Sequence, residues 1–228
     1  GTEGQGLRRA VEMAVEAVNA AKRFPYKIEA APFDDRADPK EAVNVANLII
    51  SDPRVLAVIG HYNSSCAIPA AKVYAKGGVL MITPAATNPE VTRQQLSPDW
   101  VGPRMVFRVV PSDDVQGPYA AKFIYEKLGK RRMSIMHDKT SYGQGLAEEF
   151  KKTYLALGGK VLSEDGVSVG DKDYKALLTR IKSSNAEGLY FGGLYTEAGL
   201  IVKQMRELGM KTLFFSGDGS KTPGLFDV

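Results

Sequence analysis

Short apolar runs alternate with amphipathic helical segments along almost the whole chain, and this alternation limits the fold more than any other feature. Apolar residues at helical spacing from Leu7 to Val18 mark the first helix. Asp38-Pro39-Lys40-Glu41 begins the second, with an N-cap, a proline in the first turn and a capping-box glutamate. Strands joined by helices pair in parallel, so the sequence predicts an α/β fold with helices on both faces of its sheets.

The other elements follow the same pattern. Strands are predicted at Tyr26–Phe33, Val55–Ile59, Val79–Thr83, Met105–Val110, Met133–His137, Gly188–Phe191 and Thr212–Phe215. Helices are predicted at Ser64–Lys76, before Leu128-Gly129, and over residues 146–154, 174–181 and 198–208. Val55–Ile59 is short and rich in β-branched residues, which predicts a strand buried on both faces. Pro111-Ser112-Asp113-Asp114 interrupts the series, so we expect one lobe at 1–111 and a second at 112–228.

Composition narrows the class of protein. The 228 residues are 44% hydrophobic and 25% charged, which is typical of a soluble globular chain with a sizeable core. The 30 basic and 26 acidic residues are scattered, and no basic cluster interleaved with aromatics indicates a nucleic-acid partner. No apolar run reaches the roughly 18 residues of a membrane span. No cofactor or metal site is predicted, because neither His61 nor His137 has a second ligand at metal-binding spacing.

The single cysteine, Cys66, excludes an internal disulfide and lies among small residues, so we expect it to be buried and unreactive.

Two hypotheses in which the chain is an enzyme have little support in the sequence. Gly1-Thr2-Glu3-Gly4-Gln5-Gly6 precedes a helix, but its glycine spacing is not that of a dinucleotide loop. Ser64 and His61 could suggest a hydrolase, but there is no nucleophile elbow, and a turnover assay on esters and amides would test this.

Polar residues follow the strands, at the sheet edge where open parallel sheets bind ligands. Gly60-His61-Tyr62-Asn63-Ser64-Ser65 brings hydroxyls and amides to a helix start, although a serine there could merely cap the helix. Residues 84–89 are small and could equally form an ordinary loop. Asp138 to Gly143 supplies an aromatic, Tyr142, and Ser216-Gly217-Asp218-Gly219 supplies a carboxylate that a plain turn would also explain. Together these groups are the partners that a free amino acid requires.

The chain resembles the leucine/isoleucine/valine-binding proteins of bacterial ABC uptake systems, which are type I periplasmic binding proteins. The resemblance covers essentially all 228 residues in order. It is carried by Asp34-Asp35, Asp38 to Val43, Ile59-Gly60-His61 with Asn63-Ser64-Ser65, Leu80 to Glu90, Gln116-Gly117-Pro118, His137-Asp138-Lys139, Tyr142 to Ala147 and Gly192-Gly193. It implies two doubly wound parallel-sheet lobes joined by a hinge of three crossovers. The opening strand and the segment that returns to the first lobe are missing, so the fold is expected to be incomplete at both termini.

The resemblance also implies a set of ligand contacts. Ser64 and Thr87 would hold the ligand carboxylate, while the carbonyl of Ala85 and the carboxylate of Asp218 would hold its ammonium. Tyr142 would close over the ligand from the second lobe.

Several positions depart from the family pattern. Glu3 stands where relatives commonly carry a ligand-covering tyrosine, and Leu194 replaces the tyrosine after the paired glycines, although Tyr195 is adjacent. Asp218 replaces a glutamate, and the positions of the family disulfide correspond to Ala37 and Asn63. The end of the site that binds the ligand's main chain is therefore retained, while its side-chain specificity is open.

By this resemblance the chain is a solute-binding protein and not an enzyme, and it captures a branched-chain or other hydrophobic amino acid in the cleft between two lobes. The expected partner is the membrane permease of an ABC transporter, with the binding protein monomeric. The expected location is periplasmic, or extracellular and membrane-attached. The alternative is the ligand-sensing domain of a receptor or regulator with the same fold. An export signal would favour transport, and a DNA-binding or kinase segment would favour sensing.

Overall fold

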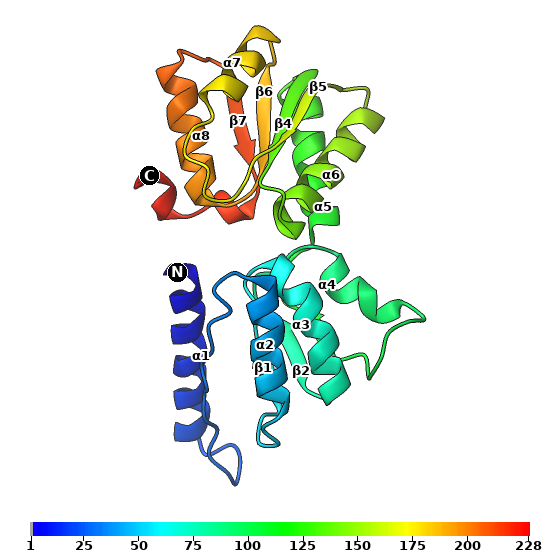
Figure 1. Cartoon of the computed structure of the whole chain (residues 1–228), viewed down its shortest axis with the longest axis vertical. Coiled ribbons are helices and arrows are strands. Elements are labelled where there is room, and N and C mark those ends of the chain that lie inside the picture. The colour runs from blue at the N-terminus through cyan, green and yellow to red at the C-terminus, as the bar shows by residue number, and fades with distance from the viewer. Residues whose placement is uncertain (1) are drawn as a thin grey trace. The chain divides into compact units, whose positions relative to one another are not determined.

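The computed structural model describes residues 2–228, with Thr2 described by its backbone alone. The chain forms two compact units. The first contains the residues up to Ala86 together with Glu90–Val110, and the second contains Thr87–Pro89 together with Pro111–Val228. The colours of Figure 1 follow the chain through the first unit, from blue to green, and then through the second.

The first unit is built on a parallel sheet in the order β1 (Ala57–Ile59), β2 (Leu80–Thr83) and β3 (Val106–Arg108). Helices α2 (Pro39–Ile50) and α3 (Ser64–Gly77) pack on each other and contribute most of the core. Short helical turns, α4 (Glu90–Arg93) and Gln94–Leu96, precede β3. The buried residues of this core are Ala42, Ala46, Ile49, Cys66, Ala67, Ala70, Ala71, Tyr74, Val79, Met81, Ala86, Val91 and Val106.

Helix α2 begins with the predicted N-cap, Asp38, and the predicted proline, Pro39. The Asp38 carboxylate accepts from the backbone N–H groups of Lys40, at 2.7 Å, and Glu41, at 3.0 Å. These bonds satisfy two of the amides that a helix start leaves without a helical partner. The Asp38 N–H donates to the Asp35 carbonyl at 2.9 Å, so the loop before the helix takes the place of the reciprocal capping-box bond.

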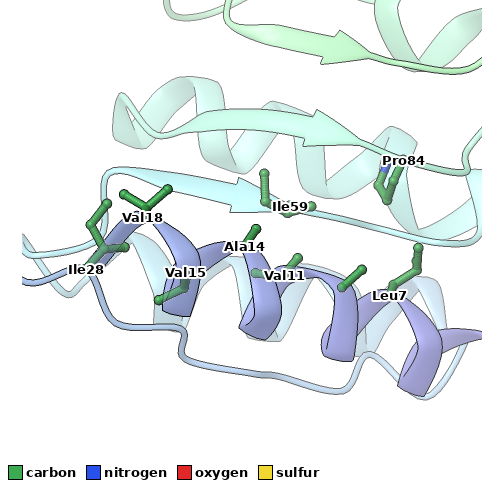
Figure 2. Close-up of a pocket in the computed structure, with 9 residues that line it drawn as sticks. Leu7, Val11, Ala14, Val15, Val18, Ile28, Ile59 and Pro84 are labelled. Carbon is green, nitrogen blue, oxygen red and sulfur yellow. The ribbon is translucent and has the colours of Figure 1, made fainter. Parts of the chain in front are cut away.

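An apolar groove of about 400 Å³ separates helix α1 (Thr2–Ala20) from strand β1. Figure 2 shows Leu7, Val11 and Ala14 projecting from α1 toward the strand that carries Ile59. The groove is lined by Leu7, Ala10, Val11, Ala14, Val15, Val18, Ile28, Ile59 and Pro84. The apolar face of α1 is therefore only half buried, because it borders the groove and not a packed core.

Two predictions for this unit are wrong. The strand predicted at Tyr26–Phe33 is absent from the described sheets, and no strand pairs with these residues. Instead the Asn19 side chain bonds both backbone groups of Ile28, at 2.8 and 2.9 Å. The strand at Val55–Ile59 is reduced to β1 and is not buried on both faces. It is the sheet edge, and 49% of Ile59 is exposed beside the groove.

The second unit has a parallel sheet in the order β5 (Lys160–Gly166), β4 (Arg132–His137), β6 (Gly188–Gly192) and β7 (Leu213–Ser216). Helix α5 (Asp113–Lys122), its π-helical continuation Phe123–Lys127 and α6 (Ser141–Ala156) cover one face. Helices α7 (Lys175–Ser183) and α8 (Tyr195–Glu207) cover the other. This is the doubly wound arrangement that the sequence predicts. Strand β5 was not predicted, because its residues alternate between half-buried and exposed at a sheet edge.

Neighbouring residues of the central strands supply the two cores. Met133, Ile135 and Tyr190 pack under α5 and α6, whereas Met136 and Phe191 pack under α7 and α8. Successive side chains of a strand point to opposite faces, so each core takes every second residue. The strand order places β4 and β6 side by side although β5 lies between them in sequence. The chain therefore reverses direction across the sheet there, and ligands of open α/β sheets bind at such a point.

We predict that shortening an apolar side chain beside the groove has little effect on the stability of the first unit. Val11→Ala should change the free energy of unfolding by less than about 1 kcal/mol, because Val11 borders open space. Met81→Ala, in the core, should cost about 2–5 kcal/mol. Trp100 is the one tryptophan of the sequence and packs against this core, so its fluorescence in a urea titration reports on this unit. Equal losses for the two variants would contradict the groove.

Candidate functional site

The carboxyl ends of β1 and β2 lie next to each other and are tied together by Thr83. Its buried hydroxyl donates to the His61 carbonyl at 2.7 Å and accepts from the N–H of Ala86 at 2.9 Å and of Ala85 at 3.3 Å. One hydroxyl thus holds the loop that leads to Ser64 and the loop that contains Ala85. Two of the predicted ligand residues are positioned by the same side chain.

Ser64 is buried at the first position of α3, a helix of 14 residues. The N-cap residue is Asn63, whose side chain makes no capping hydrogen bond. Ser64 is therefore not the cap, which was the simpler interpretation of a serine at this position. A helix amino terminus carries partial positive charge, so a hydroxyl placed there suits the binding of an anion.

The ring of His61 is fully engaged inside the first unit. Its Nδ1 lies 2.6 Å from Asp35 Oδ2, and its Nε2 lies 3.1 Å from the Tyr74 hydroxyl. Because both ring nitrogens have partners, His61 is not placed to take a proton from Ser64, and the geometry gives the hydrolase hypothesis no support.

Two further groups of this unit have shifted pKa values. Burial raises the pKa of the Cys66 thiol to about 12, and the nearby Asp35 carboxylate adds to the shift, so Cys66 is inert as expected. Burial also acts to raise the pKa of Asp35. Hydrogen bonds from His61 and from the Ala37 N–H outweigh that effect, so the pKa lies below its ordinary value of 3.8.

In the second unit, three predicted residues meet at the carboxyl ends of the strands. The Tyr142 hydroxyl donates to Asp218 Oδ1 at 2.9 Å and accepts from the Gly219 N–H at 3.0 Å. Leu194 packs on the same turn, since a Cβ added to Gly219 would lie 2.9 Å from its Cδ2 atom. Burial and the Asp218 charge raise the pKa of Tyr142, so its hydroxyl stays protonated and able to donate.

Gln116 is a member of this cluster to which sequence analysis gave no role. Its Nε2 donates to Asp218 Oδ1 at 3.0 Å and to Asp113 Oδ1 at 3.1 Å, and its Oε1 accepts from the Asp218 N–H at 2.6 Å. Asp113 is completely buried in the first turn of α5. Asp113 and Gln116 are three residues apart in one helix, and this spacing indicates that their side chains can pair. Asp218 is 102 residues away from Gln116, so the local sequence does not indicate that contact.

Close backbone contact fixes the start of α6 against the end of β6. A Cβ on Gly143 would lie 2.2 Å from Asp138 Oδ1 and 2.4 Å from the Gly192 carbonyl oxygen. Thr140 caps the helix by accepting from the Gly143 N–H at 3.0 Å. Asp138, whose pKa is raised by burial, accepts in turn from the Thr140 N–H at 2.9 Å and hydroxyl at 2.6 Å. These contacts place Tyr142.

Of the remaining predicted residues, Thr87 is linked to the second cluster through Asp113. The Thr87 carbonyl accepts from the Asp113 N–H at 3.0 Å, so Thr87 belongs with the second unit. Glu3 lies in the first turn of α1, in the first unit. Gly4 and Gly6 are helical there and form no phosphate-binding loop, while Gly1 lies outside the described residues.

Within residues 2–228 no three acidic, histidine or cysteine side chains are grouped to hold a metal ion. None of the helices described combines the length and the apolar character needed to cross a bilayer.

Comparison with known proteins identifies the family. A sequence model described as periplasmic binding protein matches residues 1–223. The chain belongs to the periplasmic binding protein family. Among curated relatives, the Leu/Ile/Val-binding protein homolog 1 of Brucella suis is 43% identical over 217 residues, which are 95% of this chain and 56% of the relative. A leucine-, isoleucine-, valine-, threonine- and alanine-binding protein of Pseudomonas aeruginosa is 39% identical over the same shares.

Solved structures of binding proteins also match this chain. A leucine-binding protein from Thermotoga maritima superposes with a TM-score of 0.84 at 33% identity, covering 96% of this chain and 61% of that protein. A branched-chain amino acid substrate-binding protein of Streptococcus pneumoniae, in complex with isoleucine, gives 0.82 at 28% identity and covers 96% and 60%. The chain thus spans a little over half the length of the binding proteins it matches. All four are named as binding proteins.

We predict that the glycine contact is necessary for the second unit. Gly143→Ala should destabilise the fold by about 1–3 kcal/mol, because the new methyl meets backbone that cannot move aside. Gln144→Ala, at the next and exposed position, is the control and should change stability by less than about 0.5 kcal/mol. Thermal unfolding followed by circular dichroism compares them. A fully stable Gly143→Ala variant would contradict the packing described.

We predict a pH dependence for the bond between Asp35 and His61. Asp35→Asn should cost about 1–3 kcal/mol at pH 7, because a neutral amide replaces the carboxylate in a partly buried charge-assisted hydrogen bond. Because the folded pKa lies below 3.8, this stabilisation is complete above that pH and is lost as pH falls through the folded value. The difference from wild type should therefore shrink below about pH 4. Trp100 fluorescence in urea measures it, and Asp34→Asn, a neighbouring exposed carboxylate, should show neither effect.

Proposed function

We propose that this chain is the ligand-binding part of a solute-binding protein that serves an ABC uptake transporter and captures an aliphatic amino acid without chemical turnover. The observation that carries the proposal is the pairing of Tyr142 with Asp218 at the carboxyl ends of β4 and β7. It presents an oriented carboxylate at the sheet edge where parallel α/β sheets bind ligands. A carboxylate held in this way is a suitable partner for an ammonium group.

Each proposed contact has a chemical reason. Ser64, at the amino end of α3, and Thr87 donate to the ligand carboxylate. The Ala85 carbonyl and Asp218 accept from the ammonium. Leu194 and Glu3, where the sequence departs from the family pattern, are proposed contacts of the ligand side chain. These residues belong to both units of the chain.

The names of the relatives support a ligand class. Curated relatives with 43% and 39% identity are named for leucine, isoleucine and valine, and the second of them also for threonine and alanine. We propose leucine, isoleucine or valine as the ligand, an ABC permease as the partner, and a monomer at the periplasmic or outer face of the membrane. A thermal-shift screen of the chain against these amino acids tests this, because a ligand that binds the folded state stabilises it by mass action. No shift with any of them would contradict the proposal.

We predict that Ser64→Ala and Thr87→Ala each weaken leucine binding by roughly 1–3 kcal/mol, because each removes a donor to a desolvated carboxylate. Isothermal titration calorimetry gives the dissociation constants. Ser183→Ala and Thr179→Ala, both on exposed positions of α7, are matched controls that should bind leucine as wild type does. Unchanged affinity in both Ser64→Ala and Thr87→Ala would remove these residues from the site.

A further inference from the structure

The side-chain amide of Gln116 contacts Asp218 at two points. Its Oε1 accepts from the Asp218 backbone N–H at 2.6 Å, and its Nε2 donates to the Asp218 carboxylate at 3.0 Å. One bond holds the main chain of the turn and the other holds the side chain. Gln116 therefore restrains both the position of Asp218 and the direction of its carboxylate.

The buried Asp113 carboxylate fixes the orientation of this amide. It accepts the second N–H of Gln116 Nε2 at 3.1 Å, and its own N–H is bonded to the Thr87 carbonyl at 3.0 Å. A flipped amide would place Oε1 against two carboxylate oxygens and Nε2 against an N–H, with three repulsive contacts in place of three hydrogen bonds. Only one orientation of the Gln116 amide satisfies these partners.

The bonds to Asp218 are unevenly shared between its two oxygens. Both Gln116 and Tyr142 donate to Oδ1, and across the described chain no donor reaches Oδ2. A ligand cation would therefore meet Oδ2. The turn has little freedom to move, since a Cβ on Gly217 would lie 2.8 Å from both Gln116 Oε1 and the Tyr142 hydroxyl oxygen. The packing favours a single direction for Oδ2.

We propose that Gln116 is a positioning residue for amino-acid recognition, and that by orienting Asp218 it makes the site selective for ligands with a primary ammonium. The proposal rests on the proposed function, because it assigns Asp218 to the ligand ammonium. Recognition of the ligand ammonium then needs Gln116. Recognition of the ligand carboxylate and of its aliphatic group does not need Gln116. Gln116 itself need not touch the ligand.

The test compares leucine with 4-methylpentanoate, which is leucine without its ammonium group. Gln116→Met keeps the length of the side chain and removes the amide. Leucine affinity should fall about tenfold or more, the equivalent of one charge-assisted hydrogen bond. The affinity for 4-methylpentanoate, measured by calorimetry or by displacement of leucine, should change less than about twofold. Gln144→Met, on the exposed face of α6, should change neither.

The outcomes are distinct. If Gln116→Met weakens both ligands equally, its role is merely structural and the proposal is wrong; it is also wrong if leucine binding does not change. Asp218→Asn gives the reference, because it should reduce the preference for leucine over 4-methylpentanoate in the same direction. Wild-type protein that binds neither ligand would overturn the proposed function itself. If wild type binds both equally well and Asp218→Asn changes nothing, amino-acid binding could stand, but Asp218 would not recognise the ammonium.

Discussion

The contact between Gly143 and Gly192 is the constraint on which the polar cluster of the second unit depends. With no side chain on either residue, the first turn of α6 approaches the end of β6 more closely than any Cβ would allow. That approach brings Tyr142 over the turn after β7, where its hydroxyl lies between Asp218 and the Gly219 N–H. The hydrogen bonds of the cluster thus depend on backbone packing, with Gly143 directly after Tyr142 and glycines on both sides of Asp218.

Much of the architecture could be predicted from local patterns. The Asp38 cap, the alternation of Met133 and Ile135 with Met136, and the glycine after α8 each act over a few residues, so the sequence displays them directly. The sequence also predicted that Tyr142 and Asp218 lie near each other, because parallel strands have their carboxyl ends at one edge of the sheet. Periodicity and topology together were enough for these features.

Features that depend on distant neighbours could not be predicted in the same way. Tyr26–Phe33 has a strand-like composition, but a strand exists only where another strand pairs with it. The edge strand β5 has the partner but lacks the apolar run, because one side of it meets solvent. Gln116 is a third case, since its partner Asp218 is 102 residues away and only the folded sheet brings them together.

The candidate ligand groups of the two units differ in the charge that they favour. The second unit gathers two carboxylates, Asp113 and Asp218, around one amide, and an anion would be repelled there unless donors lay close by. In the first unit Ser64 occupies the amino end of a long helix, where an anion is favoured. A zwitterion that met only one of these regions would lose water from both charges and gain partners for one. Under the proposed function, a zwitterion therefore needs both an anion-binding group such as Ser64 and an oriented carboxylate such as that of Asp218.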